Sequence, residues 1–338
     1  MTFASPELLQ ALHQCSKRQP VARDVTPFET VLQQAPFSLR RYHLPAHPPA
    51  GKPLLLVYST VNRPDLLDLS VRRSMIRKLL EAGRDVFLVD WGRPLSADCL
   101  LDLEDYVQDF LGRAVRWLAR RHDAQPLDAI GICQGGIFLS CYAALHPGTI
   151  GRLINMAVPL HPPAAGHGLG HLAESWTATS VADGNIPGPL LSAAFTALKP
   201  TDLLIRRYAS LPAVSANEEA LDDFLHLEAW MYDCPDQPAA LFNQFVTELY
   251  QQGALLRGRL TIGGRRVDLS AITARVLSIH AEQDHLVPPA VTAGLGEILP
   301  SDRYRAVGVS GGHLGLFTGG RSGRAVMAAI LDWLAADD

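Results

Sequence analysis

Nearly continuous apolar runs of strand length recur along the chain and alternate with stretches in which apolar residues keep a helical spacing. The runs are residues 54–58, 85–91, 127–132, 152–158, 275–281 and 304–309. Runs without polar alternation are typical of parallel strands that are buried on both faces. Helical patterns lie between them, as at residues 74–83 and 103–121. The pattern predicts an α/β fold with a mostly parallel sheet and helices on both faces.

The alternation stops after Pro159 and resumes at residue 275. Between these points, a loop rich in proline, glycine and histidine is followed by helical patterns at residues 221–232 and 239–252. We therefore expect four parts: an irregular N-terminal arm (1–50), a first part of the core (51–159), an inserted helical cap (160–268) and a second part of the core (269–338). The cap is expected to be mobile and to gate the site, and the alternative is a rigid insertion that only enlarges the core.

Composition narrows the functional classes. The 338 residues, 48% of them apolar, suit one large domain with an insertion, and the net charge of −4 gives no reason to expect nucleic acid. The longest apolar stretch, residues 129–145, is broken by a glycine turn and Gln134, so no transmembrane segment is expected. No secretory signal is evident at the N-terminus. The five cysteines are scattered, which indicates neither a disulfide framework nor a zinc site and favours a reducing cytoplasm.

The string GICQGG places Cys133 between Gly131 and Gly135, after an apolar strand and before an apolar helix. This strand–turn–helix context is that of a nucleophile elbow, in which glycines let neighbouring backbone pass close to a strained turn. A thiol stands where such elbows usually carry a serine hydroxyl. The context predicts that Cys133 is a catalytic nucleophile.

A thiol nucleophile needs a base, and the base needs an orienting partner. Asp284 follows the run at residues 275–281, and His313 follows the run at residues 304–309. The order Cys133, Asp284, His313 resembles that of α/β-hydrolases, and all three residues follow strands, where open α/β sheets place their sites. Taken singly, the aspartate could be a turn residue and the histidine a solvated loop residue. Their joint occurrence favours a catalytic triad.

Acyl transfer also needs donors for an oxyanion. The backbone N–H of Gln134 is one candidate, and the N–H of Val61, in the loop after the first apolar run, is the other. A plain turn is the alternative for that loop. His285, beside Asp284, either lines the site or holds the turn.

The histidines at positions 161, 167 and 171 form a cluster in the loop after Pro159. No acid or cysteine accompanies them at ligand spacing, so we interpret them as loop residues and expect no metal. No nucleotide or flavin motif occurs either, and no cofactor is expected.

Several motifs together resemble the catalytic subunit of polyhydroxyalkanoate synthases, most closely the short two-subunit type (class III). In chain order they are VNRP, DVFLVDWG, GICQGG, GNIPG with LKP, WMYDCPDQP, IGGRRVDL, AEQDHLVPP and GGHLGLFTG. The resemblance covers residues 54–334 and implies an α/β-hydrolase core with a cap and a Cys–Asp–His triad at Cys133, Asp284 and His313. It also matches Trp230 to an aromatic position in the cap segment.

The resemblance implies polymerisation of 3-hydroxyacyl-CoA into polyester with release of CoA, and a second subunit for full activity. A short-chain substrate such as 3-hydroxybutyryl-CoA, a granule surface in the cytoplasm and a homodimer are further expectations. Asn62, His285 and Trp230 are the candidate substrate-binding residues, and Trp230 and Phe224 are expected to line a path for the polyester. The alternatives are a cysteine-dependent thioesterase or ester hydrolase of the same fold, and a non-catalytic granule-associated protein.

Overall fold

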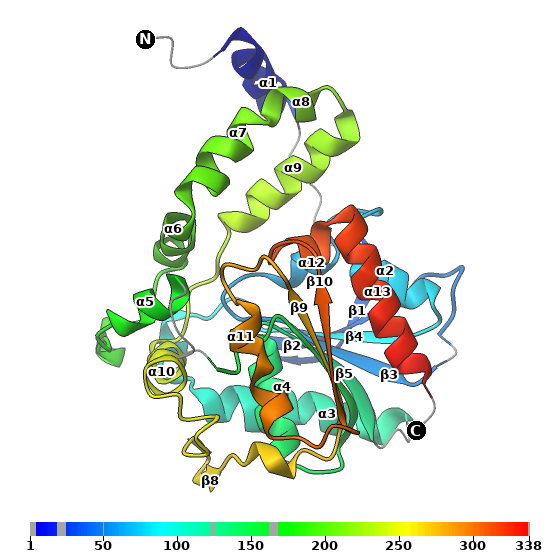
Figure 1. The fold of residues 1–338 in the computed structure, drawn as a ribbon, viewed down its shortest axis with the longest axis vertical. Helices are drawn as coiled ribbons and strands as arrows, with labels where there is room; N and C mark the ends of the chain where they lie inside the picture. The colour runs from blue at the N-terminus through cyan, green and yellow to red at the C-terminus, as the bar shows by residue number, and fades with distance from the viewer. Residues whose placement is uncertain (1–4, 19–24, 50, 123–125, 162–167, 337–338) are drawn as a thin grey trace.

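The computed structural model describes residues 5–18, 25–49, 51–122, 126–161 and 168–336. Within them, an eight-stranded sheet runs in the order β1-β2-β4-β3-β5-β6-β9-β10 (Figure 1). Its strands are β1 (Phe28–Gln34), β2 (Phe37–Tyr42), β3 (Pro53–Val57), β4 (Asp85–Asp90), β5 (Leu127–Ile132), β6 (Ile150–Met156), β9 (Arg275–Ala281) and β10 (Tyr304–Val309). From β4 to β10 all neighbours are parallel, whereas β1–β2 and β2–β4 are antiparallel. The predicted α/β fold with a mostly parallel sheet is therefore confirmed.

Helices fill the intervals between strands. The α-helices are α1 (Pro6–Ser16), α2 (Met75–Glu81), α3 (Gly112–His122), α4 (Gln134–Leu145), α5 (Gly168–Glu174), α6 (Gly188–Leu198), α7 (Arg207–Ala209), α8 (Leu211–Ser215), α9 (Glu218–Met231), α10 (Ala239–Gln244), α11 (Pro289–Thr292), α12 (Gly315–Thr318) and α13 (Gly320–Ala335). Wider π-type turns form η3 (Asp105–Leu111), η5 (Thr201–Arg206) and η6 (Phe245–Gln251). Short 3₁₀ turns form η1 (Pro64–Leu67), η2 (Ser96–Leu100), η4 (Val181–Asp183), η7 (Leu269–Ala271) and η8 (Ala293–Glu297). A small hairpin consists of β7 (Thr261–Ile262) and β8 (Arg265–Arg266).

The central strands are buried on both faces, and alternate residues enter different cores. Leu55 and Val57 of β3 pack in a cluster with side chains of α3 and α4, whereas Leu54 and Leu56 pack in a second cluster with side chains of α2 and α13. Each of these four side chains is at most 1% exposed. Because successive strand residues point to opposite faces, a continuous apolar run is what a sheet covered on both sides requires.

The expectation of an irregular arm over residues 1–50 is wrong for β1 and β2, which extend the main sheet. Backbone pairing joins β2 to β4, with Leu39 opposite Val89. Prolines 27 and 36 lie just outside the two strands, so neither removes a donor from the strand interiors. The polar residues of β1 are tolerated because it is an edge strand with one exposed side.

Helices α5 to α9 (residues 168–231) extend away from the sheet and are drawn in green in Figure 1, with α1 at their far end in blue. We call this helical segment the arm from here on. Helix α1 packs there through Ala11 against Leu211 of α8 and Leu221 of α9. The second half of the expected cap behaves differently, because Leu241, Phe245 and Leu249 pack in the same core as α4. Apart from the end of α9, where Leu227 and Trp230 pack against the core, the arm lies away from the sheet, and the chain from α10 onward belongs to the packing of the core. Over the described residues, no helix is both long and apolar enough to cross a bilayer.

Candidate active site

Cys133 lies in the sharp turn between β5 and α4, where three glycines allow the backbone to pass closely. A Cβ on Gly131 would lie 2.4 Å from the Cα of Gly136, and a Cβ on Gly135 would lie 2.2 Å from the carbonyl oxygen of Val57. Contacts this short with backbone atoms exclude any side chain at these positions. Cys133 itself has φ 50° and ψ −124°, a conformation that L-residues rarely adopt. The predicted elbow geometry is therefore present.

His313 joins Cys133 to Asp284. Its Nδ1 lies 2.7 Å from Oδ2 of Asp284, and Cys133 is close enough to raise the pKa of its ring. The other carboxylate oxygen of Asp284 accepts the backbone N–H groups of Leu286 and Val287, each at 2.9 Å. The Asp284 side chain is fully buried and that of His313 is 11% exposed. The three residues that the sequence places after β5, β9 and β10 are thus brought together at one site.

Electrostatic interactions within the triad shift the pKa values of His313 and Asp284. Burial alone lowers the pKa of His313, but its hydrogen bond to Asp284 and the neighbouring Asp284 and Cys133 side chains raise that pKa to about 10. Burial raises the pKa of the Asp284 carboxyl, but the hydrogen bond and charge of His313 and the two backbone N–H groups lower it below its ordinary value. A histidine whose protonated form is stabilised in this way can accept the proton of a neighbouring thiol, which is what a cysteine nucleophile requires.

The two predicted oxyanion donors lie on either side of the elbow. Gln134 is the first residue of α4, so its backbone N–H has no acceptor in a preceding helical turn. The N–H of Val61 donates to the hydroxyl of Ser59 at 3.0 Å. An oxyanion would have to replace this hydroxyl as the acceptor, and the role of Val61 stays a prediction.

The candidate substrate-binding residues lie around the loop after β3. The indole N–H of Trp230, at the end of α9, donates to the carbonyl of Arg63 at 2.7 Å, and Trp230 packs against the cluster that Cys133 also contacts. Asn62 lies beside Arg63 in that loop and is half-buried, as is His285 next to Asp284. The substrate-binding roles of Asn62, His285 and Trp230 stay predictions.

Phe224 lies elsewhere. It packs with Tyr208 and under the guanidinium of Arg207 at 4.4 Å, within the cluster between α1 and α8. This places it with the outer arm and not with the cluster around Cys133.

Sequence reasoning missed two tyrosines near the thiol. The pKa values of Tyr58 and Tyr250 are raised above the ordinary value, first by burial and then by the charge of Cys133. Tyr58 directly follows β3, so its place after a strand was an available signal. Tyr250 comes from η6, and only the fold brings it here.

The histidine cluster is tested only in part, because His167 lies outside the described residues. His161 is held by its backbone N–H, which donates to Val291 at 2.9 Å, and His171 lies 3.4 Å from Glu174 on the same exposed helix. Among the residues with described positions, no group of three or more His, Cys, Asp or Glu side chains could hold a metal ion.

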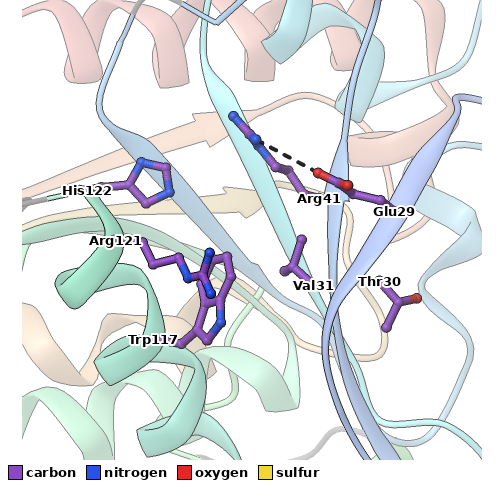
Figure 2. A pocket seen from close by; sticks show the side chains of 7 residues that line it. All are labelled: Glu29, Thr30, Val31, Arg41, Trp117, Arg121 and His122. Carbon is purple, nitrogen blue, oxygen red and sulfur yellow. Dashed lines mark ion pairs between the residues drawn. The ribbon is translucent and has the colours of Figure 1, made fainter.

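A pocket of about 420 Å³ lies at the opposite end of the sheet from the triad (Figure 2). Its lining comes from β1, β2 and the end of α3, where Arg121 stacks over Trp117 at 4.7 Å and Arg41 pairs with Glu29 at 3.8 Å. Arg41 also binds Asp85, the first residue of β4, at 2.9 Å. Because the triad follows the carboxyl ends of the parallel strands, this pocket is not part of the site.

Comparison with known proteins agrees with this geometry. A family model of the α/β-hydrolase fold matches residues 64–320. Solved structures at low identity share the fold: a hydrolase from Pseudomonas aeruginosa PA01 has a TM-score of 0.55 at 17% identity, covering 91% of this chain and 98% of that one. A thermophilic esterase from Thermogutta terrifontis has a TM-score of 0.53 at 13% identity, again covering 91% and 98%.

Curated relatives are more specific. The poly(3-hydroxyalkanoate) polymerase subunit PhaC of Allochromatium vinosum is 36% identical over 98% of this chain and 94% of its own length. The subunit of the same name from a Synechocystis strain is 37% identical over 92% of this chain and 84% of its own. With its α/β-hydrolase fold and these relatives, the chain belongs to the poly(3-hydroxyalkanoate) polymerase PhaC family of acyltransferases.

Proposed function

We propose that this chain polymerises short-chain 3-hydroxyacyl-CoA thioesters, such as 3-hydroxybutyryl-CoA, through an acyl-enzyme on Cys133. The observation that carries the proposal is the position of His313, which is hydrogen-bonded to the buried carboxylate of Asp284 and lies beside Cys133 in the elbow. A nucleophile, a base and an orienting acid in contact are what covalent acyl transfer requires. Membership in the PhaC family supports a CoA thioester as substrate and a polyester as product.

In the first half of the cycle, His313 takes the proton of Cys133 and the thiolate attacks the thioester carbonyl. The oxyanion accepts hydrogen bonds from the N–H groups of Gln134 and Val61. When the carbonyl re-forms, the carbon–sulfur bond to CoA breaks, and the CoA thiolate takes the proton from His313. The acyl group stays on Cys133.

In the second half, the 3-hydroxyl of another hydroxyacyl unit attacks the acyl carbonyl on Cys133. The hydroxyl proton passes to His313, an ester bond forms and Cys133 leaves as a thiolate. The thioester is a suitable intermediate because exchange between thioesters is nearly balanced in energy, so the acyl group remains reactive toward an alcohol.

The test is incubation with 3-hydroxybutyryl-CoA while CoA release and insoluble polyester are followed together. We expect both products from the wild-type chain and neither from Cys133→Ala, because no other residue of the elbow can hold the acyl group. Cys133→Ser should be strongly impaired, since a hydroxyl is a far weaker nucleophile at neutral pH. Free 3-hydroxybutyrate without polymer would identify a thioesterase, and no CoA release would indicate a non-catalytic granule protein.

Partners and location belong to the same proposal. We infer a second synthase subunit, a homodimer and attachment to polyester granules in the cytoplasm. In support, the arm exposes large apolar side chains that nothing in the described chain covers: Leu172, Leu190, Leu204 and Ile205, at 40, 55, 39 and 66% exposure. Running the incubation with and without a candidate second subunit would show whether that subunit raises the rate.

A further inference from the structure

Gln237, in the segment between α9 and α10, is hydrogen-bonded to the loop after β3, which carries the proposed second oxyanion donor. The Nε2 of Gln237 donates to the carbonyl of Thr60 at 2.7 Å, and its Oε1 accepts the hydroxyl of Thr60 at 2.6 Å. The side chain is 2% exposed. The backbone of Gln237 is itself fixed, because its N–H and carbonyl both pair with Ile186, at 2.9 and 2.8 Å. The backbone that carries the Gln237 side chain is therefore held by two hydrogen bonds.

The hydrogen bond from Gln237 fixes the peptide unit between Thr60 and Val61. The carbonyl of Thr60 and the N–H of Val61 belong to the same planar trans peptide, in which the two groups point in opposite directions. Gln237 holds the oxygen, and the N–H points to the hydroxyl of Ser59 at 3.0 Å. Fixing the carbonyl thus fixes the direction of the Val61 N–H.

The same loop is tied to the residue after the nucleophile. Oε1 of Gln134 accepts the backbone N–H of Thr60 at 3.0 Å and lies 2.7 Å from its hydroxyl and 3.3 Å from that of Ser59. Ser59, Thr60 and Gln134 are each 5% exposed. The hydroxyl of Thr60 has one proton and two acceptors, Gln134 and Gln237, so the amide donor of Gln237 is the contact that secures the peptide.

We propose that Gln237 is a positioning residue that orients the Thr60–Val61 peptide and thereby completes the oxyanion hole. The proposal rests on the proposed function in taking Val61 as the second donor. If Gln237 is withdrawn, the Thr60 carbonyl loses its donor, and the direction of the Val61 N–H depends only on the Ser59 hydroxyl, which an oxyanion has to replace. Acyl transfer is then coupled to the seating of the Gln237 segment against the core.

The decisive variant is Gln237→Glu, which keeps the size of the side chain and replaces the amide donor with a carboxylate oxygen facing the Thr60 carbonyl. We expect the first turnover of CoA release from 3-hydroxybutyryl-CoA to slow by roughly 100-fold, the usual effect of losing one oxyanion donor. Alkylation of Cys133 by iodoacetamide needs the thiolate but forms no oxyanion, so its rate should stay within about twofold.

Acid should rescue this variant in part. When the introduced carboxyl is protonated, its O–H can donate to the Thr60 carbonyl, so the ratio of variant to wild-type acylation should rise as the pH falls. Gln237→Met has no such proton and should be slow at every pH. A role confined to holding the fold together would not produce this difference between the two variants.

Gln251→Glu is the matched control. Gln251 is another glutamine that donates to carbonyls, those of Ala173 at 2.7 Å and Trp176 at 2.9 Å, but these contacts join the end of η6 to the start of the arm and do not involve the oxyanion loop. Its substitution should leave both the acylation rate and the alkylation rate unchanged.

Two results would overturn the inference. One is an unchanged acylation rate in Gln237→Glu, and the other is an equal fall in acylation and alkylation. Failure of the proposed function has a different signature in wild-type protein. Free 3-hydroxybutyrate without polymer would identify a thioesterase and leave the acylation test valid, whereas a protein that releases no CoA needs another reagent. In that case p-nitrophenyl acetate, whose transfer to Cys133 also forms an oxyanion, replaces the thioester. Wild-type protein inert to both reagents would remove the oxyanion hole and the inference with it.

Discussion

Both carboxylate oxygens of Asp284 are already engaged, one with His313 and the other with the N–H groups of Leu286 and Val287. The sequence left two roles open for this residue, support of His313 or activation of the 3-hydroxyl. A fully buried carboxylate that already accepts one hydrogen bond from the imidazole and two from backbone N–H groups is well placed to orient the histidine. The geometry therefore supports the first role, with His313 as the base.

This division of roles predicts different defects in two variants. His313→Gln should reduce acylation of Cys133 by roughly 100-fold or more, because the base is lost. Asp284→Asn should retain part of the acylation and slow elongation more, since a free thiol with a pKa of about 8.5 already has a few per cent thiolate near neutral pH. Radiolabelled acyl-enzyme formation measures the first step. Full and equal acylation of both variants would remove His313 from the role of base.

The shifted pKa values also predict how stability depends on pH. Because the folded-state pKa of His313 is raised to about 10, its contribution to stability is complete below its unfolded value of about 6.5 and is lost as the pH rises toward 10. The pKa of Asp284 is lowered, so its contribution is present above about pH 4 and is lost on acidification. The two contributions are complete together between about pH 4 and 6.5.

Urea unfolding of wild type and His313→Gln measures this effect. The difference between their free energies of unfolding should be largest within that window and should shrink as the pH approaches 10. A difference that is the same at both ends of the range would contradict the pairing.

At the scale of elements, the sequence predicted the central strands to within about two residues, because a buried parallel strand is a continuous apolar run that glycine or proline ends. The strands β9 and β10 match their predicted ranges. The hairpin of β1 and β2 escaped prediction because only one side of its outer strand is covered. Its polar residues and flanking prolines resemble those of a loop.

The residues of the candidate site also differ in how far the sequence predicts them. Cys133, Asp284 and His313 were predictable because each follows a strand and their residue types carry chemistry. Gln237 and Thr60 were not, since they are separated by 177 positions and neither residue type signals a function on its own. Their contact is a product of the tertiary fold.

The elbow itself makes a prediction at this scale. A Cβ on Gly135 would lie 2.2 Å from the carbonyl oxygen of Val57 and 2.5 Å from that of Tyr58, both backbone atoms of the neighbouring strand. Gly135→Ala should therefore force β3 and α4 apart and lower the free energy of unfolding by about 3 kcal/mol.

Gly320→Ala is the control for this substitution. Its Cβ would meet only the guanidinium of Arg324, at 3.9 Å, so the free energy of unfolding should change by less than about 0.5 kcal/mol. Equal stability of the two variants would show that the close approach at the elbow is not required.

At the scale of the whole molecule, the segment expected to act as one cap has two kinds of packing. Helices α7 to α9 share a small cluster with α1, whereas α10 and η6 share the large core with α4. Local stability follows the number of buried apolar contacts, so the two parts should open with different free energies. Only the arm is suited to the predicted gating role.

Hydrogen exchange tests this division. Amides in α6 to α9 should exchange fast and become protected when a second subunit or a substrate analogue is added. Amides in η6 should exchange as slowly as those in α4 under both conditions. Uniform protection of the whole segment, unaffected by either addition, would favour the rigid insertion.

The position of α1 has a practical consequence for labelling. Helix α1 packs on α8 and α9 at the tip of the arm. A fluorescent protein or affinity tag fused ahead of α1 would therefore lie beside the tip and could block a partner that binds there. Helix α13, at the other end of the chain, lies on the sheet face with Ile330 and Leu334 buried. A tag placed after α13 would lie away from the arm, so imaging or pull-down experiments with this tag would leave the surface of the arm accessible to partners.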